Sequence, residues 1–221
     1  METSASKEET RRSYDLLSHF YELLSSSSER RFVREAVDRY LIPTAGERIL
    51  EVGFGAGHVL VELAERVGDG GKVYGLDISE GMVRVTRRRV RRRGLERRVE
   101  LVKGDAAKMP FEAGFFDAVF MSFTLELFPE PEIPTVLGEC FRVLKERGRL
   151  CLASMYDSRE RGPMMRLYLW LHRRLPRFVD CRPIRASQYV AEAGFRVEAT
   201  ELLSICGLPV EVVLGRKDTG A

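Results

Sequence analysis

Short apolar runs alternate with amphipathic segments through the middle of the chain, between Arg48 and Ser154. Such runs are typical of strands buried on both faces, and the segments between them have the spacing of helices. Regular alternation of the two favours a parallel sheet covered by helices on both sides. The predicted strands are Arg48–Val52, Lys72–Asp77, Val99–Lys103, Phe116–Met121 and the weaker Arg149–Ser154.

Three helices are predicted between these strands, because apolar residues recur there at intervals of three and four. Gly68, Gly94 and Gly148 follow the last periodic residues of the three segments, where a left-handed cap conformation suits glycine best. The predicted helices are His58–Val67, Glu80–Arg93 and Ile133–Lys145.

The two ends of the chain add further elements to this central region. Their periodicity predicts a pair of helices at each end and two closing strands that pair like a hairpin. The sequence therefore predicts a doubly wound α/β fold with a mostly parallel seven-stranded sheet and an antiparallel last strand. The added elements are Ser13–Leu24, Glu29–Leu41, Pro163–Leu175, Ala186–Ala193, Arg196–Leu203 and Pro209–Leu214.

Composition narrows the class of protein without specifying a partner. Lys and Arg number 36 against 33 Asp and Glu, and this net charge of +3 is too small to indicate nucleic-acid binding. No run of eighteen apolar residues predicts a spanning helix, and Met1–Glu9 lacks the pattern of a secretory signal, so a cytoplasmic location is expected. The cysteines form no C-x-x-C pair, which argues against a thiolate metal site and favours small buried side chains.

Three alternate glycines follow the first predicted strand. Gly53, Gly55 and Gly57 stand at the carboxyl end of the sheet, where open α/β folds bind ligands. A dinucleotide-binding loop would have its third glycine at the position of His58. Glu51, two residues before the loop, would repel a pyrophosphate but attract a cationic amino group. The loop therefore favours a zwitterionic ligand without phosphate.

Acidic residues also end the next two strands. Asp77 closes the second strand, where a carboxylate can accept hydrogen bonds from both hydroxyls of a ribose. Asp105 follows the third strand, where it can accept a hydrogen bond from an exocyclic adenine amine. The joint placement of these acids and the glycine loop predicts a site for an adenosyl compound.

These segments resemble the successive motifs of class I S-adenosylmethionine-dependent methyltransferases, which have a Rossmann-like fold. Within that class the chain is similar to the ubiquinone/menaquinone-biosynthesis group. The resemblance runs from about Tyr14 to Met155 and includes Met109-Pro110-Phe111, Phe116-Asp117 and Arg142-Val143-Leu144-Lys145. It implies residues 1–45 as a helical cap, 46–155 as the cofactor core of a domain over 46–221, and 156–221 as substrate-side helices and final strands.

The resemblance also implies roles for individual residues toward S-adenosylmethionine and its product S-adenosylhomocysteine. Glu51 would orient the methionine amino group, and the loop from Gly53 to Gly57, Phe54 included, would lie against the carboxypropyl and ribose parts. Asp77 would bind the ribose. The other implied contacts are Ile78 and Met82 beside the adenine, Asp105 and Ala106 at its edge, Ser122 and Phe123 near the sulfonium, and Tyr14 as a cover.

Several alternatives stay open at the level of sequence. His19, His58 and His172 receive no catalytic role, and no metal is expected. The nine arginines between Arg84 and Arg98 form either a solvated face or a surface for an anionic membrane or nucleic acid. The helix Pro163–Leu175 is either a lid, an interfacial helix or packing for the sheet edge.

The methyl acceptor is the least specified part of the prediction. A small or lipophilic acceptor, such as a quinone precursor or a lipid amine, is expected, with peripheral membrane contact as an accompanying hypothesis. A nucleotide-dependent reductase and a non-catalytic cofactor-binding or RNA-associated protein are the alternatives. The sequence leaves the oligomeric state open between monomer and homodimer.

Overall fold

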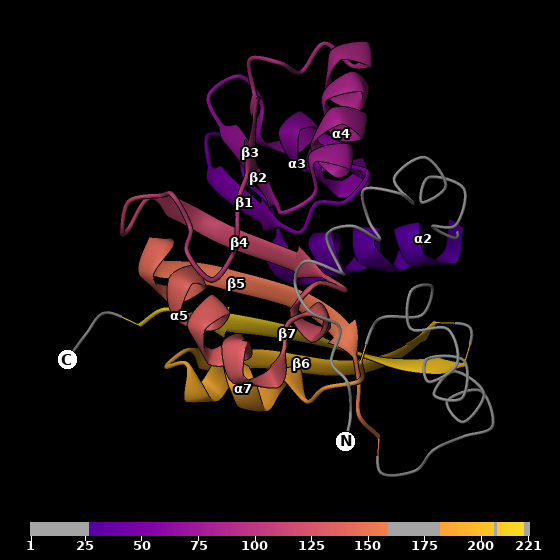
Figure 1. Cartoon of the computed structure of the whole chain (residues 1–221), viewed down its shortest axis with the longest axis vertical. Helices are drawn as coiled ribbons and strands as arrows, with labels where there is room; N and C mark the ends of the chain where they lie inside the picture. Colours follow the sequence, from indigo (N-terminus) through magenta and orange to yellow (C-terminus); the bar gives the residue numbers. More distant parts are fainter. Residues whose placement is uncertain (1–26, 159–181, 206, 219–221) are drawn as a thin grey trace.

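The computed structural model describes residues 27–158, 182–205 and 207–218. Its centre is a seven-stranded sheet in the order β3-β2-β1-β4-β5-β7-β6, drawn in Figure 1. The predicted helices over 13–24 and 163–175 lie outside the described residues. The strands are β1 (Arg48–Val52), β2 (Lys72–Asp77), β3 (Val99–Lys103), β4 (Phe116–Ser122), β5 (Leu144–Met155), β6 (Arg196–Ile205) and β7 (Leu208–Arg216).

The topology confirms the predicted doubly wound class. Strands β1 to β5 pair in parallel, whereas β7 runs antiparallel to both β5 and β6. β6 and β7 form the expected hairpin, in which Ile205 pairs with Leu208. The α-helices are α2 (Ser27–Ala36), α3 (His58–Val67), α4 (Glu80–Arg92), α5 (Ile133–Val143) and α7 (Ala186–Glu192), and a π-helical turn η1 (Val37–Leu41) continues α2.

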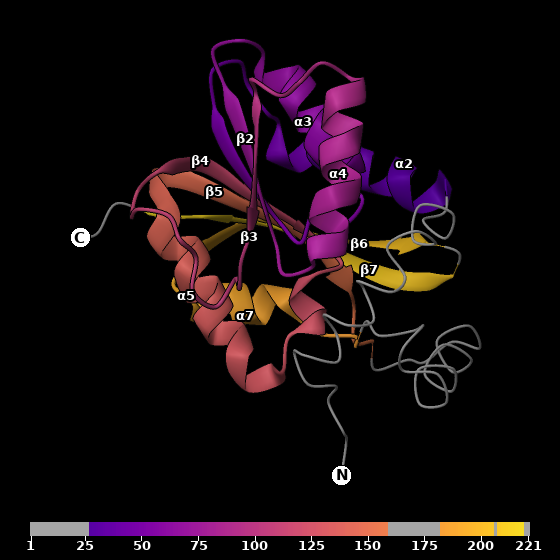
Figure 2. The same cartoon turned by 45° about the horizontal axis from the view of Figure 1, so that its top comes forward.

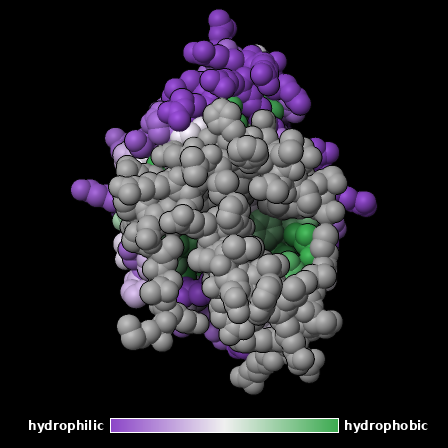
Figure 3. Space-filling model, turned by 45° about the vertical axis from the view of Figure 1, so that its right-hand side comes forward, coloured by the Kyte–Doolittle hydropathy of each residue, from purple (hydrophilic) through white to green (hydrophobic). Residues whose placement is uncertain are grey.

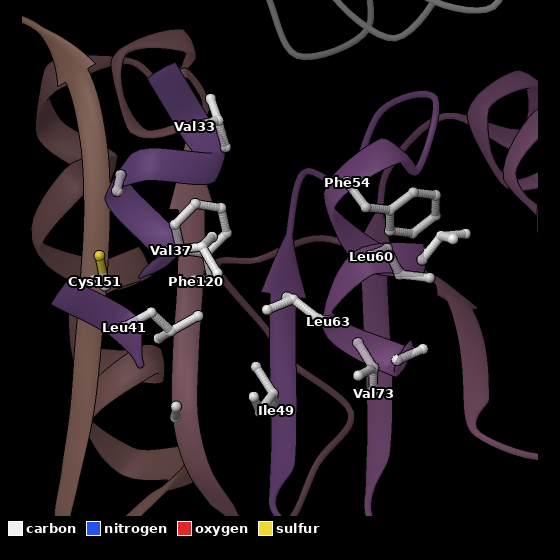
Figure 4. Close-up of a cluster of buried hydrophobic side chains, with 14 of the residues drawn as sticks. Val33, Val37, Leu41, Ile49, Phe54, Leu60, Leu63, Val73, Phe120 and Cys151 are labelled. Atoms are coloured by element: carbon white, nitrogen blue, oxygen red, sulfur yellow. The ribbon is translucent and has the colours of Figure 1, made fainter. Parts of the chain in front are cut away.

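Two apolar cores form because strand side chains alternate between the faces of the sheet. In β4, for example, Phe120 belongs to one core while Val119 and Met121 belong to the other. Helices α2, α3 and α4 cover the first face, and α5 and α7 cover the second, as Figures 1 and 2 show from two directions. Figure 4 shows the first core, where Leu60 and Leu63 of α3 meet the strands.

The end of α5 differs from the sequence prediction. The helix ends at Val143 and the chain enters β5 at once, so Gly148 is a strand residue and not a helix cap. A left-handed φ of 61° occurs instead at Arg147, where a bulge separates the pairing of β4 with Leu144 from its pairing with Arg149. A Cβ on Gly148 would lie 2.8 Å from the carbonyl oxygen of Lys145. Glycine is thus required by crowding in the bulge.

The other two predicted caps, Gly68 and Gly94, both have positive φ values, of 65° and 66°. Gly68, however, has a ψ of −166° and so does not adopt the left-handed helical conformation that was predicted for it. Cys140 and Cys151 are buried free thiols, and burial raises the pKa of each to about 12, so both behave as small core residues. The remaining cysteines, Cys181 and Cys206, lie outside the described residues.

Arg149 ties the first helix to the sheet. Its guanidinium donates to both carboxylate oxygens of Glu47, at 2.7 and 2.8 Å, and to the carbonyl oxygens of Leu41 and Ile42. Burial raises the pKa of Glu47, but hydrogen bonds from Arg149 and Thr44 outweigh it and lower that pKa overall. Residues 27–41 therefore share the core of the sheet, while the division of the chain at residue 45 remains a prediction.

Candidate functional site

The glycine loop connects β1 to α3 at the carboxyl edge of the sheet. Gly53, Gly55 and Gly57 all have left-handed φ values, of 70°, 49° and 72°. A Cβ on Gly53 would lie 2.3 Å from Cγ2 of Thr124, and a Cβ on Gly57 would lie 2.3 Å from Cγ2 of Thr86. Both conformation and space therefore require glycine at Gly53 and Gly57.

Asp77 fixes this loop from the end of β2. One carboxylate oxygen accepts from the N–H of Gly55 at 3.0 Å, and the other accepts from the N–H of Ser79 at 2.9 Å. Ser79 in turn caps α4, because its hydroxyl accepts from the N–H of Met82. A carboxylate offers about four acceptor sites, so Asp77 can hold the loop and also accept from a ligand.

Glu51 lies beneath the loop and is 2% exposed. Its Oε2 has no hydrogen-bond partner within the described part of the chain. Burial, and secondarily the charge of Asp77, raises the pKa of Glu51 well above its usual value. A buried carboxylate without a partner is costly, and an ammonium group of a ligand would relieve that cost. This orphaned oxygen fits the amino group of S-adenosylmethionine.

Two side chains of α5, Arg142 and Glu139, hold the loop after β3, and we call this pair the clamp. Asp105 and Ala106 begin this loop, and the carboxylate of Asp105 accepts from the N–H of Ala107 at 2.9 Å. Further along, Arg142 of α5 donates to the carbonyl oxygens of Met109 and Phe111, at 3.1 and 2.8 Å. Glu139 binds the same arginine and accepts from the N–H of Met109 at 2.7 Å. These bonds join two sequence motifs that lie thirty residues apart.

Arg142 and Glu139 also set each other's ionisation. The hydrogen bond from Arg142 lowers the pKa of Glu139, against a smaller opposing effect of burial. The same bond raises the pKa of Arg142. The clamp is therefore a charged pair at neutral pH, with charge-assisted bonds on both sides.

Phe123 follows β4 with a left-handed φ of 49°, which is uncommon for a bulky residue. Its N–H donates to the carbonyl oxygen of Ala153 at 2.8 Å, and its ring centroid lies 6.2 Å from that of Phe32. Such strain persists only where the surrounding structure enforces it, and it is frequent at functional sites.

These loops surround one cleft of about 810 Å³, including the part open to solvent. Nine residues that the sequence singled out line it together. They are Gly53, Gly55, Asp77, Ile78, Met82, Asp105, Ala106, Ser122 and Phe123.

Three of the other singled-out residues do not line the cleft. Glu51 lies under the cleft wall, and Gly57 packs against Thr86 at the start of α3. Phe54 is buried in the first core beside Leu60, as Figure 4 shows. Tyr14 lies outside the described residues.

Residues 49–148 match the family described as "Methyltransferase domain". The matched stretch is a little under half of the chain and includes the glycine loop and the ends of β2, β3 and β4. The resemblance to methyltransferases that was stated from the sequence is thus confirmed.

Two curated proteins of similar sequence are methyltransferases. The chain is 40% identical over 139 residues to a nocamycin O-methyltransferase of Saccharothrix syringae, covering 63% of this chain and 48% of that protein. It is 40% identical over 137 residues to the demethylmenaquinone methyltransferase of Thermus thermophilus, covering 62% of this chain and 58% of that protein. The chain thus spans about half to three fifths of the length of these two relatives.

Solved structures establish the fold over a larger part of the chain. An S-adenosylmethionine-dependent methyltransferase from Aquifex aeolicus matches with a TM-score of 0.64 and 24% identity, over 90% of this chain and 98% of that one. The [4+2]-cyclase SpnF matches with a TM-score of 0.78 and 17% identity, over 100% and 99%. At such identities the likeness concerns the fold alone.

The methyltransferase cleft includes residues that the sequence did not single out. Sequence reasoning missed Thr124 because its side chain comes close to Gly53 only when the loop is folded. The hydroxyl of Thr124 lies 3.4 Å from the carbonyl oxygen of Gly53. The position of Leu127 and Phe128 after β4 was the one available signal, because the ends of parallel strands meet at one edge. The missed residues are Val52, Leu76, Gly104, Thr124, Leu127 and Phe128.

Within the ranges that the structure describes, no group of three or more His, Cys, Asp or Glu is arranged to hold a metal ion. No helix in these ranges has the length and apolar character needed to cross a membrane.

Proposed function

We propose that this protein transfers a methyl group from S-adenosylmethionine to a small, lipophilic acceptor. The observation that carries the first half is the combination of a methyltransferase domain with the orphaned carboxylate of Glu51 and the tethered carboxylate of Asp77. Glu51 would bind the amino group, Asp77 the ribose hydroxyls, and Asp105 with Ala106 the adenine edge. The glycines of the loop would let the cofactor approach the backbone.

The apolar wall of the cleft supports the second half of the proposal, the lipophilic acceptor. Phe123, Leu127 and Phe128 line the cleft after β4, and they offer apolar surface where Asp77 and Asp105 offer carboxylates across the site. Apolar walls favour acceptors that bury hydrocarbon or aromatic surface. The names of the two relatives, a demethylmenaquinone methyltransferase and a nocamycin O-methyltransferase, agree with an acceptor of this kind.

When bound, S-adenosylmethionine supplies a methyl group on a positively charged sulfur, so that transfer disperses charge and leaves S-adenosylhomocysteine. The residues of the cleft have to align the acceptor with the carbon–sulfur bond, and such alignment can supply most of the acceleration. The strained Phe123 and the clamped loop after β3 would hold the two reactants in that alignment. A general base is required only for an acceptor that must lose a proton.

Mass spectrometry tests the cofactor independently of the acceptor. The purified protein is heat-denatured and the released small molecules are analysed. We expect S-adenosylmethionine or S-adenosylhomocysteine; release of a nicotinamide dinucleotide instead would identify the reductase alternative and overturn the proposal.

An acceptor screen tests the rest. Cofactor labelled in its methyl group is incubated with quinone precursors, hydroxylated aromatic compounds, phospholipid amines and small polar metabolites. We expect label to enter an apolar aromatic or lipid product. Transfer only to polar metabolites would refute the lipophilic acceptor, and absence of transfer to all classes would count against methyl transfer itself.

A further inference from the structure

A row of arginines covers the exposed side of α4. Its opposite side is apolar, with Val83 and Val90 buried in the first core. Hydrophilic side chains gather at the top of the molecule in Figure 3, the end at which Figure 1 shows α3 and α4. We call this row the arginine stripe; it consists of Arg84, Arg87, Arg88, Arg91 and Arg92, all exposed.

Acids on α3, just after α3 and at the start of α4 are paired with basic residues outside the stripe. Within the described part of the chain, none of the five stripe arginines takes part in an ion pair. Like charges three and four residues apart destabilise a helix, so the stripe carries uncompensated repulsion. The pairs are Glu65 with Arg93 at 3.0 Å, Asp69 with Arg98 at 2.5 Å, Glu80 with Lys103 at 3.5 Å, and Glu62 with Arg34 and Arg66 at 3.2 and 2.7 Å.

The helix that carries the stripe also contributes to the cleft. Met82 in the first turn of α4 lines the cleft, whereas Arg84, two residues further along, is exposed on another side of the helix. One helix thus carries a surface attracted to anions and a residue of the cleft, whose lining includes the apolar Leu127 and Phe128.

We propose that the arginine stripe docks the protein on the surface of an anionic phospholipid bilayer, beside the cleft that takes a lipophilic acceptor. Guanidinium groups bind phosphate with paired, charge-assisted hydrogen bonds. Basic clusters on a protein surface are attracted to bilayers that contain acidic lipids. The reason for docking rests on the proposed function, but the docking itself is measured without any methyl transfer.

Residues 80–98 favour a bilayer over a nucleic acid. They contain no aromatic residue on which an unpaired base could stack. Met82, Val83 and Val90 of α4 are buried in the core, so the helix is expected to contact the bilayer mainly by charge and not to insert. Docking is therefore expected to weaken steeply as ionic strength rises.

Vesicle sedimentation tests the proposal on the whole chain. Sucrose-loaded vesicles of phosphatidylcholine, with and without phosphatidylglycerol, are mixed with protein at low and at high ionic strength. We expect binding only to phosphatidylglycerol vesicles and only at low ionic strength. Removing two charges by Arg88→Gln with Arg91→Gln should weaken binding by about fivefold per arginine, or about twenty-fivefold in total.

A matched control separates the stripe from net charge. Arg31→Gln with Arg147→Gln removes the same charge from two exposed residues on other elements, and it should leave vesicle binding within about twofold of the original. A loss equal to that of the stripe variant would overturn the proposal. Arg88→Lys with Arg91→Lys keeps the charge and should keep binding, and all variants are compared after their unfolding midpoints are shown to agree.

Three results would contradict the inference directly. They are equal binding to neutral vesicles, unchanged binding of the Arg88→Gln and Arg91→Gln variant, and preference for a mixed-sequence single-stranded RNA over acidic vesicles. The last would make nucleic acid the partner of the stripe. Methyl transfer to a water-soluble acceptor should be the same in the stripe variant and the control, so failure of docking and failure of the proposed function are distinguishable.

Discussion

The two sides of the cleft are built differently. On the cofactor side, after β1, β2 and β3, side chains hold the backbone in place: Asp77 binds the glycine loop and Arg142 binds the loop after β3. On the acceptor side, after β4, the wall is formed by apolar residues such as Leu127 and Phe128. The family match ends at residue 148, before most of β5 and before β6 and β7.

This difference teaches where the specificity of the molecule resides. A site for a ligand of fixed shape gains from a rigid, hydrogen-bonded frame, because the binding groups are then held in place before the ligand arrives. An acceptor that changes between members is accommodated by apolar walls that can be altered without breaking the loops. Substitutions on the two sides should therefore separate cofactor affinity from acceptor affinity.

The largest effect is expected at Asp77. Asp77→Ala removes the proposed acceptor of both ribose hydroxyls and leaves the N–H groups of Gly55 and Ser79 without their carboxylate. Two charge-assisted hydrogen bonds are worth about 4 kcal/mol together, so affinity for S-adenosylmethionine should fall about a thousandfold by calorimetry.

Ser79→Ala serves as the control for Asp77. It removes only the hydroxyl that caps α4, which should cost about 1 kcal/mol of unfolding free energy and little cofactor affinity. Equal losses of affinity in the two variants would mean that Asp77 acts through the shape of the loop and not through the ribose.

The next largest effect is expected at the clamp after β3. Arg142→Met removes the donors to Met109 and Phe111 and leaves Glu139 without its partner. The free energy of unfolding should decrease by about 2 to 3 kcal/mol in urea denaturation. Arg98→Met breaks a pair with the exposed Asp69 and should cost less than about 1 kcal/mol, because exposed ion pairs contribute little. Similar losses of unfolding free energy in both variants would mean that the clamp does not stabilise the loop after β3.

Much of the cofactor side could be predicted from the sequence, because its signals are local. The glycine spacing and the acids at strand ends follow from the rule that open α/β sheets bind ligands at the carboxyl ends of their strands, and the same rule placed Ser122 and Phe123 at the other side of the cleft. The structure brings nine of the singled-out residues to one cleft for that reason. The clamp was not predictable, since Arg142 and Met109 meet only through the packing of α5.

The prediction failed where a residue type has two physical uses. Gly148 was interpreted as a helix cap, yet it relieves crowding in the bulge of β5. The resemblance implied Phe54 as part of the loop beside the cofactor; its side chain is buried in the core, and a contact between this residue and the cofactor stays a prediction. Residue spacing alone does not distinguish a helix cap from a strand bulge, or a loop side chain in the cleft from one in the core.

A smaller and pH-dependent effect is expected at Glu51. Its pKa is raised in the free protein, and a bound ammonium group would lower it, so cofactor binding releases a proton. Affinity should therefore rise with pH below the raised pKa, by up to about tenfold or 1.4 kcal/mol per pH unit. Calorimetry across pH measures this slope, and Glu51→Gln should abolish it.

The stability of the free protein should respond to pH in the opposite direction. Because folding raises the pKa of Glu51, the folded state binds more protons than the unfolded chain in this range. Its contribution is complete below the unfolded value near 4.5 and is lost as pH rises through the folded pKa. If the unfolding midpoint of the free protein did not reflect this loss of stability as pH rises through the folded pKa, the assignment would be contradicted.

The smallest effect is expected on the acceptor side, and it completes the comparison. Leu127→Ala removes part of the apolar wall, which should raise KM for a lipophilic acceptor by about fivefold, or about 1 kcal/mol, because a partly exposed contact is lost. Affinity for S-adenosylmethionine should stay unchanged, in contrast to Asp77→Ala. Leu202→Ala, at a side chain that is 55% exposed on β6, is the matched control and should change neither constant. If Leu127→Ala weakened the binding of the cofactor as much as that of the acceptor, the two walls of the cleft would act as one site. Separate roles for the two walls would then be contradicted.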